Sequence, residues 1–291
     1  MTETATNPAR PEVFRETVAA EAFGVLEQPL TPWEKAWNTG ALRKGLLLVA
    51  LALAWQMYAR ALNNPLLVPT FTATLAALWE GVAAGPLLTR AAFSIKVLLM
   101  GYGAGIAIAA LLTALAVGSR IGTDLLETLT AMFNPLPAIA LLPLALLWFG
   151  LGNPSIIFVL VHSVLWAVAL NTHSGFTSVS RTLRMVGQNC GLSGLRYVLL
   201  ILIPAAFPSI LTGLKIGWAF AWRTLIAAEL VFGVSSGSGG LGWFIYENKN
   251  QLEIPSVFAG LLSVILIGLV VENLVFRNIE SRTIRRWGMQ S

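Results

Sequence analysis

Three charged side chains lie inside one long apolar stretch, at Lys215, Arg223 and Glu229. A charge within the hydrocarbon of a bilayer costs on the order of 3 kcal/mol or more, so such a side chain usually faces a bundle interior or a wet cavity. Two cations at this depth favour a route for an anion, and Glu229 would neutralise a cation when no substrate is present. The alternative is that all three form structural ion pairs between helices.

Two tryptophans accompany these charges one helical turn apart and either line a gate or fill the bundle. The predicted translocation path is therefore Lys215, Trp218, Trp222, Arg223 and Glu229. The same stretch repeats small residues every four positions, at Gly213, Gly217 and Ala221. Such a smooth face suits close packing of helices in a membrane, either against a second copy of the chain or within one subunit.

The chain lacks the residues of a catalytic or nucleotide-binding protein. No phosphate-binding loop of the form Gly-x-x-x-x-Gly-Lys-Ser/Thr occurs, and the glycine-rich segment 235–242 has no lysine. His162 and His173 have no cysteine or carboxylate at ligand spacing, so no metal site is predicted. His162 is expected to form hydrogen bonds within the bundle. We expect no catalysis and no cofactor in this chain.

The composition predicts an all-α, multi-pass membrane protein. Hydrophobic residues make up 56% of the 291-residue chain, charged residues only 11%, and the mean hydropathy is +0.73. A soluble domain carries about 25% charge. Lipid is thus the expected surrounding, and no partner nucleic acid is expected.

Six membrane spans are predicted, because a bilayer core needs about 20 apolar residues per helix. They cover 44–62, 93–117, 125–149, 154–173, 205–232 and 255–276. A short helix over 71–83 is expected at the interface. The predicted organisation is a cytoplasmic tail with an interfacial segment over 1–43, a membrane domain over 44–276 and a basic tail over 277–291.

Prolines predict helix breaks in two of these spans. A proline frees a backbone carbonyl, which lipid tolerates only where protein or a water-filled cavity receives it. The predicted breaks are at Pro135, Pro137 and Pro143 in the third span, and at Pro204 and Pro208 at the start of the fifth.

The distribution of basic residues predicts the orientation. With both termini in the cytoplasm, 13 of the 19 lysines and arginines fall on the inner side and four on the outer side, as the positive-inside rule requires. The segment Arg181–Arg196 then lies inside the cell.

That segment carries a motif. Gly191 follows Met185-Val186-Gly187 by four residues, and Ile201-Leu-Ile-Pro204 follows after nine more. The pattern resembles the cytoplasmic Glu-Ala-Ala loop of ABC-importer permeases, although the acidic residue is missing here. The continuation Pro204-Ala-Ala-Phe-Pro-Ser and the later Ala-Ala-Glu229-Leu resemble the branch that handles nitrate, taurine, aliphatic sulfonates and bicarbonate.

The resemblance implies a type I ABC-importer permease fold in a bacterial inner membrane. It also implies a second copy of the permease, two ATPase subunits that hold ATP and Mg²⁺, and a periplasmic or lipid-anchored binding protein. The loop over 174–203 would form two short helices with a sharp turn at Gly191 and dock onto the ATPase. Its predicted contact residues are Arg184, Gly187, Gln188, Asn189, Gly191, Leu192 and Ser193. A secondary transporter or channel that works without an ATPase is the alternative.

Overall fold

The computed structural model describes residues 31–232 and 239–284, and the regular elements in these ranges are all helices. The described chain divides into two units, one ending at residue 53 and one beginning at residue 54. Predictions for the tail before residue 31, for most of the glycine-rich segment and for residues 285–291 fall outside the described residues.

In the first unit, α1 (Pro32–Asn38) precedes the start of α2 (Gly40–Leu62). Thr31 and Glu34 form the two reciprocal bonds of a capping box: the Thr31 backbone N–H donates to Glu34 Oε2 at 2.8 Å, and the Glu34 N–H donates to Thr31 Oγ1 at 3.3 Å. The backbone bond from Thr31 lowers the pKa of the Glu34 carboxyl. Trp33 and Trp37 stack with ring centroids 6.1 Å apart and are exposed, so the predicted interfacial segment is a helix with an aromatic face.

Five helices in the described residues are long and apolar enough to cross a membrane. They are α2, α4 (Leu87–Gly118), α7 (Asn153–Thr177), the continuous helix Gly194–Val231 and the continuous helix Ile254–Arg282. A bent pair, Arg120–Phe133 and Ala138–Phe149, makes a sixth if it counts as one span. The all-α membrane class is confirmed, and the described residues hold five of the six predicted spans as long helices, while the third predicted span is this bent pair.

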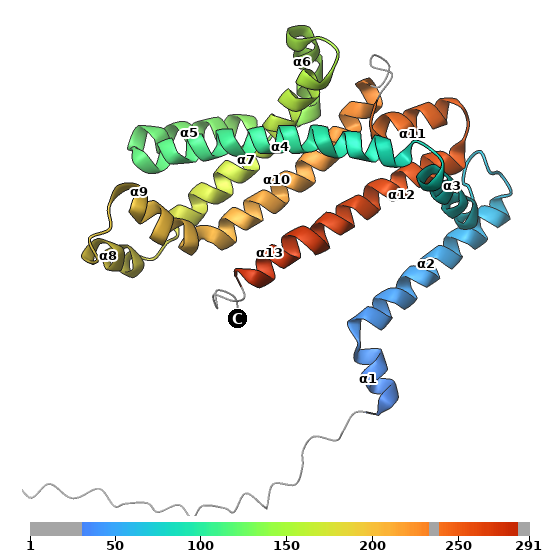
Figure 1. Cartoon of the computed structure of the whole chain (residues 1–291), viewed down its shortest axis with the longest axis horizontal. Coiled ribbons are helices and arrows are strands. Elements are labelled where there is room, and N and C mark those ends of the chain that lie inside the picture. The colour runs from blue at the N-terminus through green and yellow to red at the C-terminus, as the bar shows by residue number, and fades with distance from the viewer. Residues whose placement is uncertain (1–30, 233–238, 285–291) are drawn as a thin grey trace, which may run out of the picture. The chain divides into compact units, whose positions relative to one another are not determined.

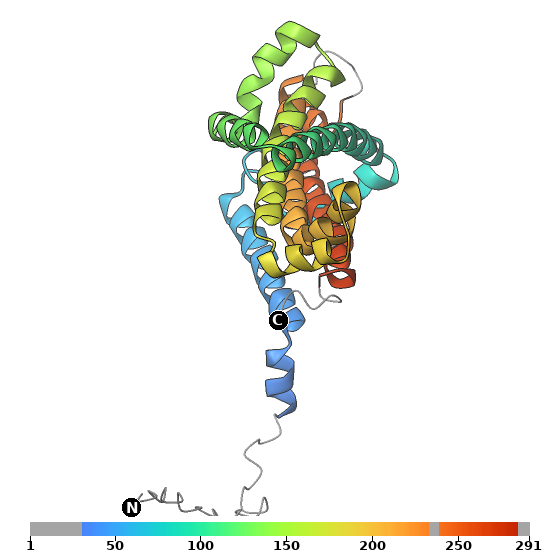
Figure 2. The same ribbon diagram turned by 90° about the vertical axis from the view of Figure 1, so that its left-hand side faces the viewer.

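The core of the second unit is built by α4, α7 and α10 (Ile203–Phe232). Figures 1 and 2 show α7 and α10 side by side, with α4 crossing them. Glycines make this contact close: a Cβ at Gly101 would lie 2.5 Å from Leu160, and one at Gly213 would lie 2.8 Å from Asn171. Gly217 likewise faces Val168 of α7. The small-residue face of α10 therefore packs within the subunit, not against a second copy.

The proline-rich third span is bent. α5 (Arg120–Phe133) and the segment Ala138–Phe149, which comprises the 3₁₀ turn η2 (Ala138–Leu141) and α6 (Leu142–Phe149), meet at 87°. Pro135 and Pro137 lie in the break between them, where their missing N–H groups cost no helical hydrogen bond. Pro143 does not break a helix, because it lies in the first turn of α6, where backbone N–H groups have no intrahelical partner.

The breaks predicted at Pro204 and Pro208 are not present. Pro204 lies in the first turn of α10, and Pro208 lies inside that helix. The π-helical turn η3 (Val198–Leu202) directly precedes them. A π turn changes the hydrogen-bond register of a helix, and we attribute the tolerance of the prolines to this change. The chain thus stays helical from Gly194 to Val231.

The remaining helices complete the second unit. α3 (Phe71–Ala83) matches the short helix predicted from the sequence, and it packs on α12 (Ile254–Val270). α11 (Leu241–Asn250) precedes α12, and the π turn η4 (Val271–Phe276) and α13 (Arg277–Arg282) continue it. The residues after 276 therefore begin as helix.

Candidate functional site

The segment between α7 and α10 contains one short helix and a sharp turn, as predicted, whereas the second predicted short helix, α9 (Gly194–Tyr197), is the first turn of the continuous helix Gly194–Val231. α8 (Arg181–Asn189) begins after Ser180, whose Oγ accepts the Leu183 N–H at 3.3 Å. It ends in a Schellman motif: the Leu192 N–H bonds the Gly187 carbonyl at 3.1 Å, and the Gly191 N–H bonds the Gln188 carbonyl at 2.9 Å. Gly191 has φ +72°, which glycine adopts without strain. α9 then leads into η3.

Two predicted loop residues face inward and fix α8 to the membrane helices. The Arg184 guanidinium donates to the carbonyls of Phe176 and Val179, at and just beyond the end of α7, which satisfies acceptors that a helix end leaves open. Gly187 is buried against η3 and α9, where an added Cβ would lie 3.0 Å from Tyr197 and Ile201. α8 is therefore clamped to the end of α7 on one side and to the segment before α10 on the other (Figure 1).

The other predicted loop residues face outward. Gln188, Asn189, Gly191 and Ser193 are exposed, and Leu192 is half-buried. Met185 and Val186, which replace the acidic and first alanine positions of the resembling motif, are also about half exposed. The accessible surface of α8 thus combines apolar, amide and basic groups without a carboxylate.

The five residues predicted for a translocation path do not lie together. Lys215 pairs with Glu280 of α13 at 2.7 Å and, at 3.8 Å, with Glu272. Trp222 is buried and donates its indole N–H to the Val264 carbonyl at 3.2 Å. Trp218 is half-buried with its ring edge-on to Tyr102, 5.4 Å between centroids. In this structure, three of the five thus hold α10 against other helices.

Glu229 lies in a separate buried cluster. Its carboxylate accepts the Ser94 hydroxyl of α4 at 2.7 Å and the Gly242 N–H at 2.9 Å, while Ser94 Oγ accepts the Leu241 N–H at 2.8 Å. Leu241 and Gly242 are the first residues of α11, whose N–H groups have no helical partner. A carboxylate suits this positive helix end. Arg90 adds a bond to the Gly239 carbonyl at 2.7 Å. We call these residues the Glu229 cluster.

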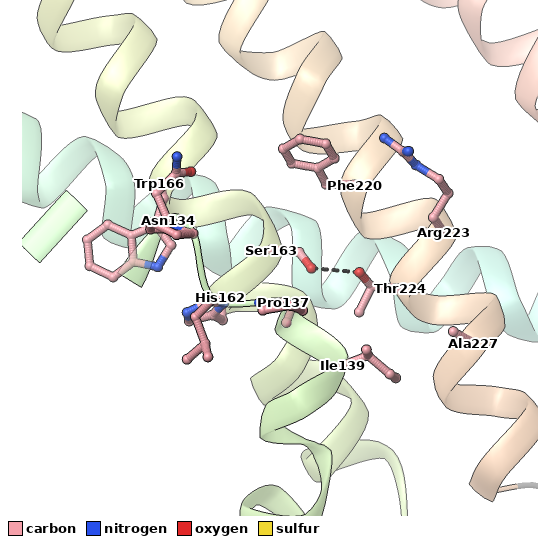
Figure 3. A pocket seen from close by; sticks show the side chains of 13 residues that line it. Asn134, Pro137, Ile139, His162, Ser163, Trp166, Phe220, Arg223, Thr224 and Ala227 are labelled. Carbon is pink, nitrogen blue, oxygen red and sulfur yellow. Dashed lines mark hydrogen bonds between the residues drawn. The ribbon is translucent and has the colours of Figure 1, made fainter. Parts of the chain in front are cut away.

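Arg223 lines a cavity that none of the other four predicted path residues lines. This cavity of about 370 Å³ lies between α7, α10 and the break after α5. Figure 3 shows Ser163 and Thr224 pointing toward one another across it, joined by a hydrogen bond of 2.9 Å. The full lining is Asn134, Pro135, Leu136, Pro137, Ala138, Ile139, His162, Ser163, Trp166, Phe220, Arg223, Thr224 and Ala227.

Several residues that line the cavity were not among the site residues predicted from the sequence. The hydrogen bonds expected for His162 are not formed: within the described residues neither of its ring nitrogens has a partner, and nor does Nε1 of Trp166. The available signal was the four-residue spacing of these two side chains in an otherwise apolar span. That spacing places both on one face of a helix, but only the fold shows that this face meets Arg223.

Residues 101–285 match the family model described as the binding-protein-dependent transport system inner membrane component. The chain belongs to this family. It is 33% identical to a candidate ABC transporter permease of Methanocaldococcus jannaschii, over 81% of this chain and 89% of that one. It is 29% identical to the taurine transport system permease of Escherichia coli (78% and 83%) and 33% identical to a nitrate import permease of Synechocystis (57% and 61%).

The permease is an inner-membrane component, and its family match runs from α4 through α13. It therefore includes the clamped α8–α9 segment, the cavity and the part of the Glu229 cluster that lies on α10 and α11, whereas Arg90 and Ser94 precede the match. The α8–α9 segment offers an exposed surface at the end of two membrane helices. The Glu229 cluster joins three helices. The cavity offers polar groups without a partner among the described residues, beside the cation of Arg223.

Proposed function

We propose that this permease is the membrane subunit of an ATP-driven importer that moves a small anion inward by alternating access. Nitrate, a sulfonate such as taurine, and bicarbonate belong to the proposed class. The working transporter contains two copies of the chain, two ATPase subunits that hold ATP and Mg²⁺, and an external binding protein that delivers the substrate. Both termini and the α8–α9 segment lie in the cytoplasm.

One observation carries the proposal: α8 is attached to both helices that line the cavity. Arg184 joins it to the end of α7, and the packing of Gly187 against Tyr197 and Ile201 joins it to the helix that becomes α10. A partner that moves α8 would therefore shift α7 and α10 together. Packed helices pass on such movements because they have little free volume to absorb them.

The exposed face of α8 indicates how the partner binds. Leu183, Met185 and Val186 present apolar surface beside Arg181. With no carboxylate on this helix, we expect the ATPase groove to supply apolar contacts and acidic side chains.

The test is substrate uptake into proteoliposomes. The permease by itself should accumulate no substrate, whereas the permease with its ATPase and binding protein should accumulate it only with Mg-ATP. Uphill uptake by the permease by itself would instead establish a secondary transporter. Labelling of Cys190, which is exposed just before the turn, should occur only from the cytoplasmic side; labelling from outside would overturn the orientation.

A glycine pair tests the clamp. Gly187→Leu forces α8 away from Tyr197 and should lower uptake while the ATPase stays bound and active. Gly103→Leu is the matched control, because a Cβ at Gly103 meets nothing within 4 Å. Equal uptake by both variants would show that the clamp is not needed for coupling.

A further inference from the structure

The cavity has polar groups on two sides and apolar surface between and around them. On α7, His162 and Trp166 lie one turn apart, with Ser163 between them on the same side. On α10, Arg223 and Ala227 lie one turn apart beside Thr224. Figure 3 shows Arg223 and Thr224 at one side, His162, Trp166 and Asn134 at the other, and Ser163 and Pro137 between them.

One side of the cavity holds hydrogen-bonding groups without partners. Trp166 is only 7% exposed, and among the described residues its indole N–H has no acceptor; both nitrogens of His162 are likewise unpaired. A buried polar group without a partner destabilises the folded state by about 1–3 kcal/mol. A ligand whose oxygen atoms accept the indole N–H and the single N–H of a neutral imidazole would recover part of that free energy.

The other side of the cavity holds a free positive charge. Arg223 is the only charged residue among the described residues that line the cavity, and it forms no ion pair within the described chain. Its Nε–H donates to the Ala219 carbonyl of its own helix at 3.1 Å, and the guanidinium carbon lies 5.2 Å from the centroid of the Phe220 ring. The other donors of its planar fork match the geometry of an oxyanion.

The size and walls of the cavity distinguish between kinds of anion. Its volume of about 370 Å³ falls within the range of sites for small organic molecules. Pro135, Pro137, Phe220 and the ring of Trp166 supply apolar surface between and around the polar sides. A bare inorganic oxyanion would contact one side only and leave the apolar walls uncovered.

We infer that this cavity binds a small organic oxyanion, a sulfonate or carboxylate with a short apolar body, as the imported substrate. The oxyanion lies at Arg223 and Thr224, the apolar body of the molecule lies against Phe220 and the prolines, and an oxygen at its far end accepts the indole N–H of Trp166. This assignment rests on the proposed import function and narrows its substrate class. Lys215 has no part in it, since its charge is paired with Glu280 and Glu272.

The experiment is ligand protection of a cysteine in the complete reconstituted transporter. Cys190→Ser removes the natural thiol, and Ala227→Cys places one in the cavity wall. Methyl methanethiosulfonate, a small neutral reagent, then modifies it with or without ethanesulfonate, 2-hydroxyethanesulfonate or nitrate at equal ionic strength. Leu230→Cys is the matched control, because Leu230 is exposed on α10 outside the cavity.

Ethanesulfonate should slow the modification at position 227 and leave position 230 unchanged, and nitrate should protect neither. Arg223→Gln should raise the half-protecting concentration about 10- to 100-fold, since bonds to a charged group are the strong ones. Trp166→Phe, which removes the N–H and one ring, should raise the half-protecting concentration of 2-hydroxyethanesulfonate, whose hydroxyl oxygen can accept the indole N–H, about fivefold, and that of ethanesulfonate by less. Arg223→Lys keeps the charge and should fall between wild type and Arg223→Gln.

Three outcomes would overturn the assignment: protection by nitrate equal to that by ethanesulfonate, full protection in a stably assembled Arg223→Gln variant, or equal protection at position 230. The result is separable from that of the uptake test. Protection without ATP-driven uptake would support the binding site and contradict the proposed import function. ATP-driven uptake without protection would contradict the proposed binding site and leave the import function supported.

Discussion

Arg223 and Glu229 lie six residues apart on α10, and their surroundings are opposite. Glu229 is 2% exposed, and its carboxylate accepts bonds from Ser94 and Gly242. Arg223 is exposed beside a cavity in which the buried nitrogens of His162 and Trp166 have no partner among the described residues. The Glu229 cluster is complete within the described chain, whereas the cavity is not.

This difference distinguishes two kinds of charged residue in a membrane helix: one that stabilises helix packing and one that is available to bind a ligand. Both kinds look alike along the sequence, because each is a charge in an apolar stretch. A charge whose hydrogen bonds are all supplied by neighbouring helices fixes those helices. A charge beside unpaired donors is available to a ligand. Substitutions in the two regions should therefore change different quantities.

The largest effect is expected from Glu229→Ala. It leaves the Gly242 N–H and the Ser94 hydroxyl buried without an acceptor, which should lower stability by roughly 3 kcal/mol or more and the melting temperature by roughly 5–10 °C. Thermal denaturation of the purified permease, followed by size-exclusion chromatography, measures it. Glu229→Gln keeps an acceptor oxygen and is the control. Normal stability combined with lost uptake would instead indicate that Glu229 is part of the translocation path, as the sequence predicted.

Arg223→Gln should give the reverse pattern. Since Arg223 is exposed and unpaired in the described chain, the melting temperature should stay within about 2 °C of wild type. Uptake of an organic sulfonate at subsaturating concentration should fall about 10- to 100-fold. Rates measured beside the melting temperature separate the two. A variant that unfolds as readily as Glu229→Ala would show that the two regions do not differ in kind.

Replacing Ser94 or Ser163 by alanine compares how much the hydrogen bonds of the two regions contribute to stability. Ser94→Ala removes a donor to Glu229 and the acceptor of the Leu241 N–H, so stability should fall by about 1–3 kcal/mol. Ser163→Ala removes one bond to Thr224, which keeps its own hydroxyl beside the cavity, and should cost about 0.5–1.5 kcal/mol. Parallel melting curves test the order. Equal losses would mean that the cavity is as tightly bonded as the cluster.

The smallest effect concerns Lys215, which the sequence grouped with Arg223. Its pair with Glu280 is partly exposed, so a double-mutant cycle of Lys215→Gln and Glu280→Gln should give a coupling of about 0.5–1 kcal/mol. Uptake should remain close to wild type in each single variant. A tenfold loss of uptake with Lys215→Gln alone would instead support the two-cation route.

The helices and the α8–α9 turn could be predicted with little error. Long apolar runs determine where spans begin and end, since a bilayer admits few other backbone conformations, and Gly191 marks a helix end because few other residues adopt its φ. The proline breaks were less predictable. Pro135 and Pro137 interrupt helix, but Pro208 does not, because the register of the preceding turn decides how a proline is accommodated.

The candidate cavity could not be derived from one sequence. His162 and Asn134 come from segments 28 positions apart, and neither carries a charge that would single it out. Trp222 looked like a path residue, yet it bonds the Val264 carbonyl of α12. Periodicity shows which side chains share a helix face; it does not show what that face meets.

The sequence by itself determined the membrane environment, the helical class, the approximate spans and the α8–α9 turn, because hydrophobic length and glycine conformation act locally. Tertiary structure alone decided which charges are paired. Lys215 and Glu229 find their partners 65 and 135 residues away, whereas in the described chain Arg223 contacts only the Ala219 carbonyl and the Phe220 ring of its own helix. Pairing of charges depends on distances across the bundle, and those are set by how α4, α7, α10 and α13 pack.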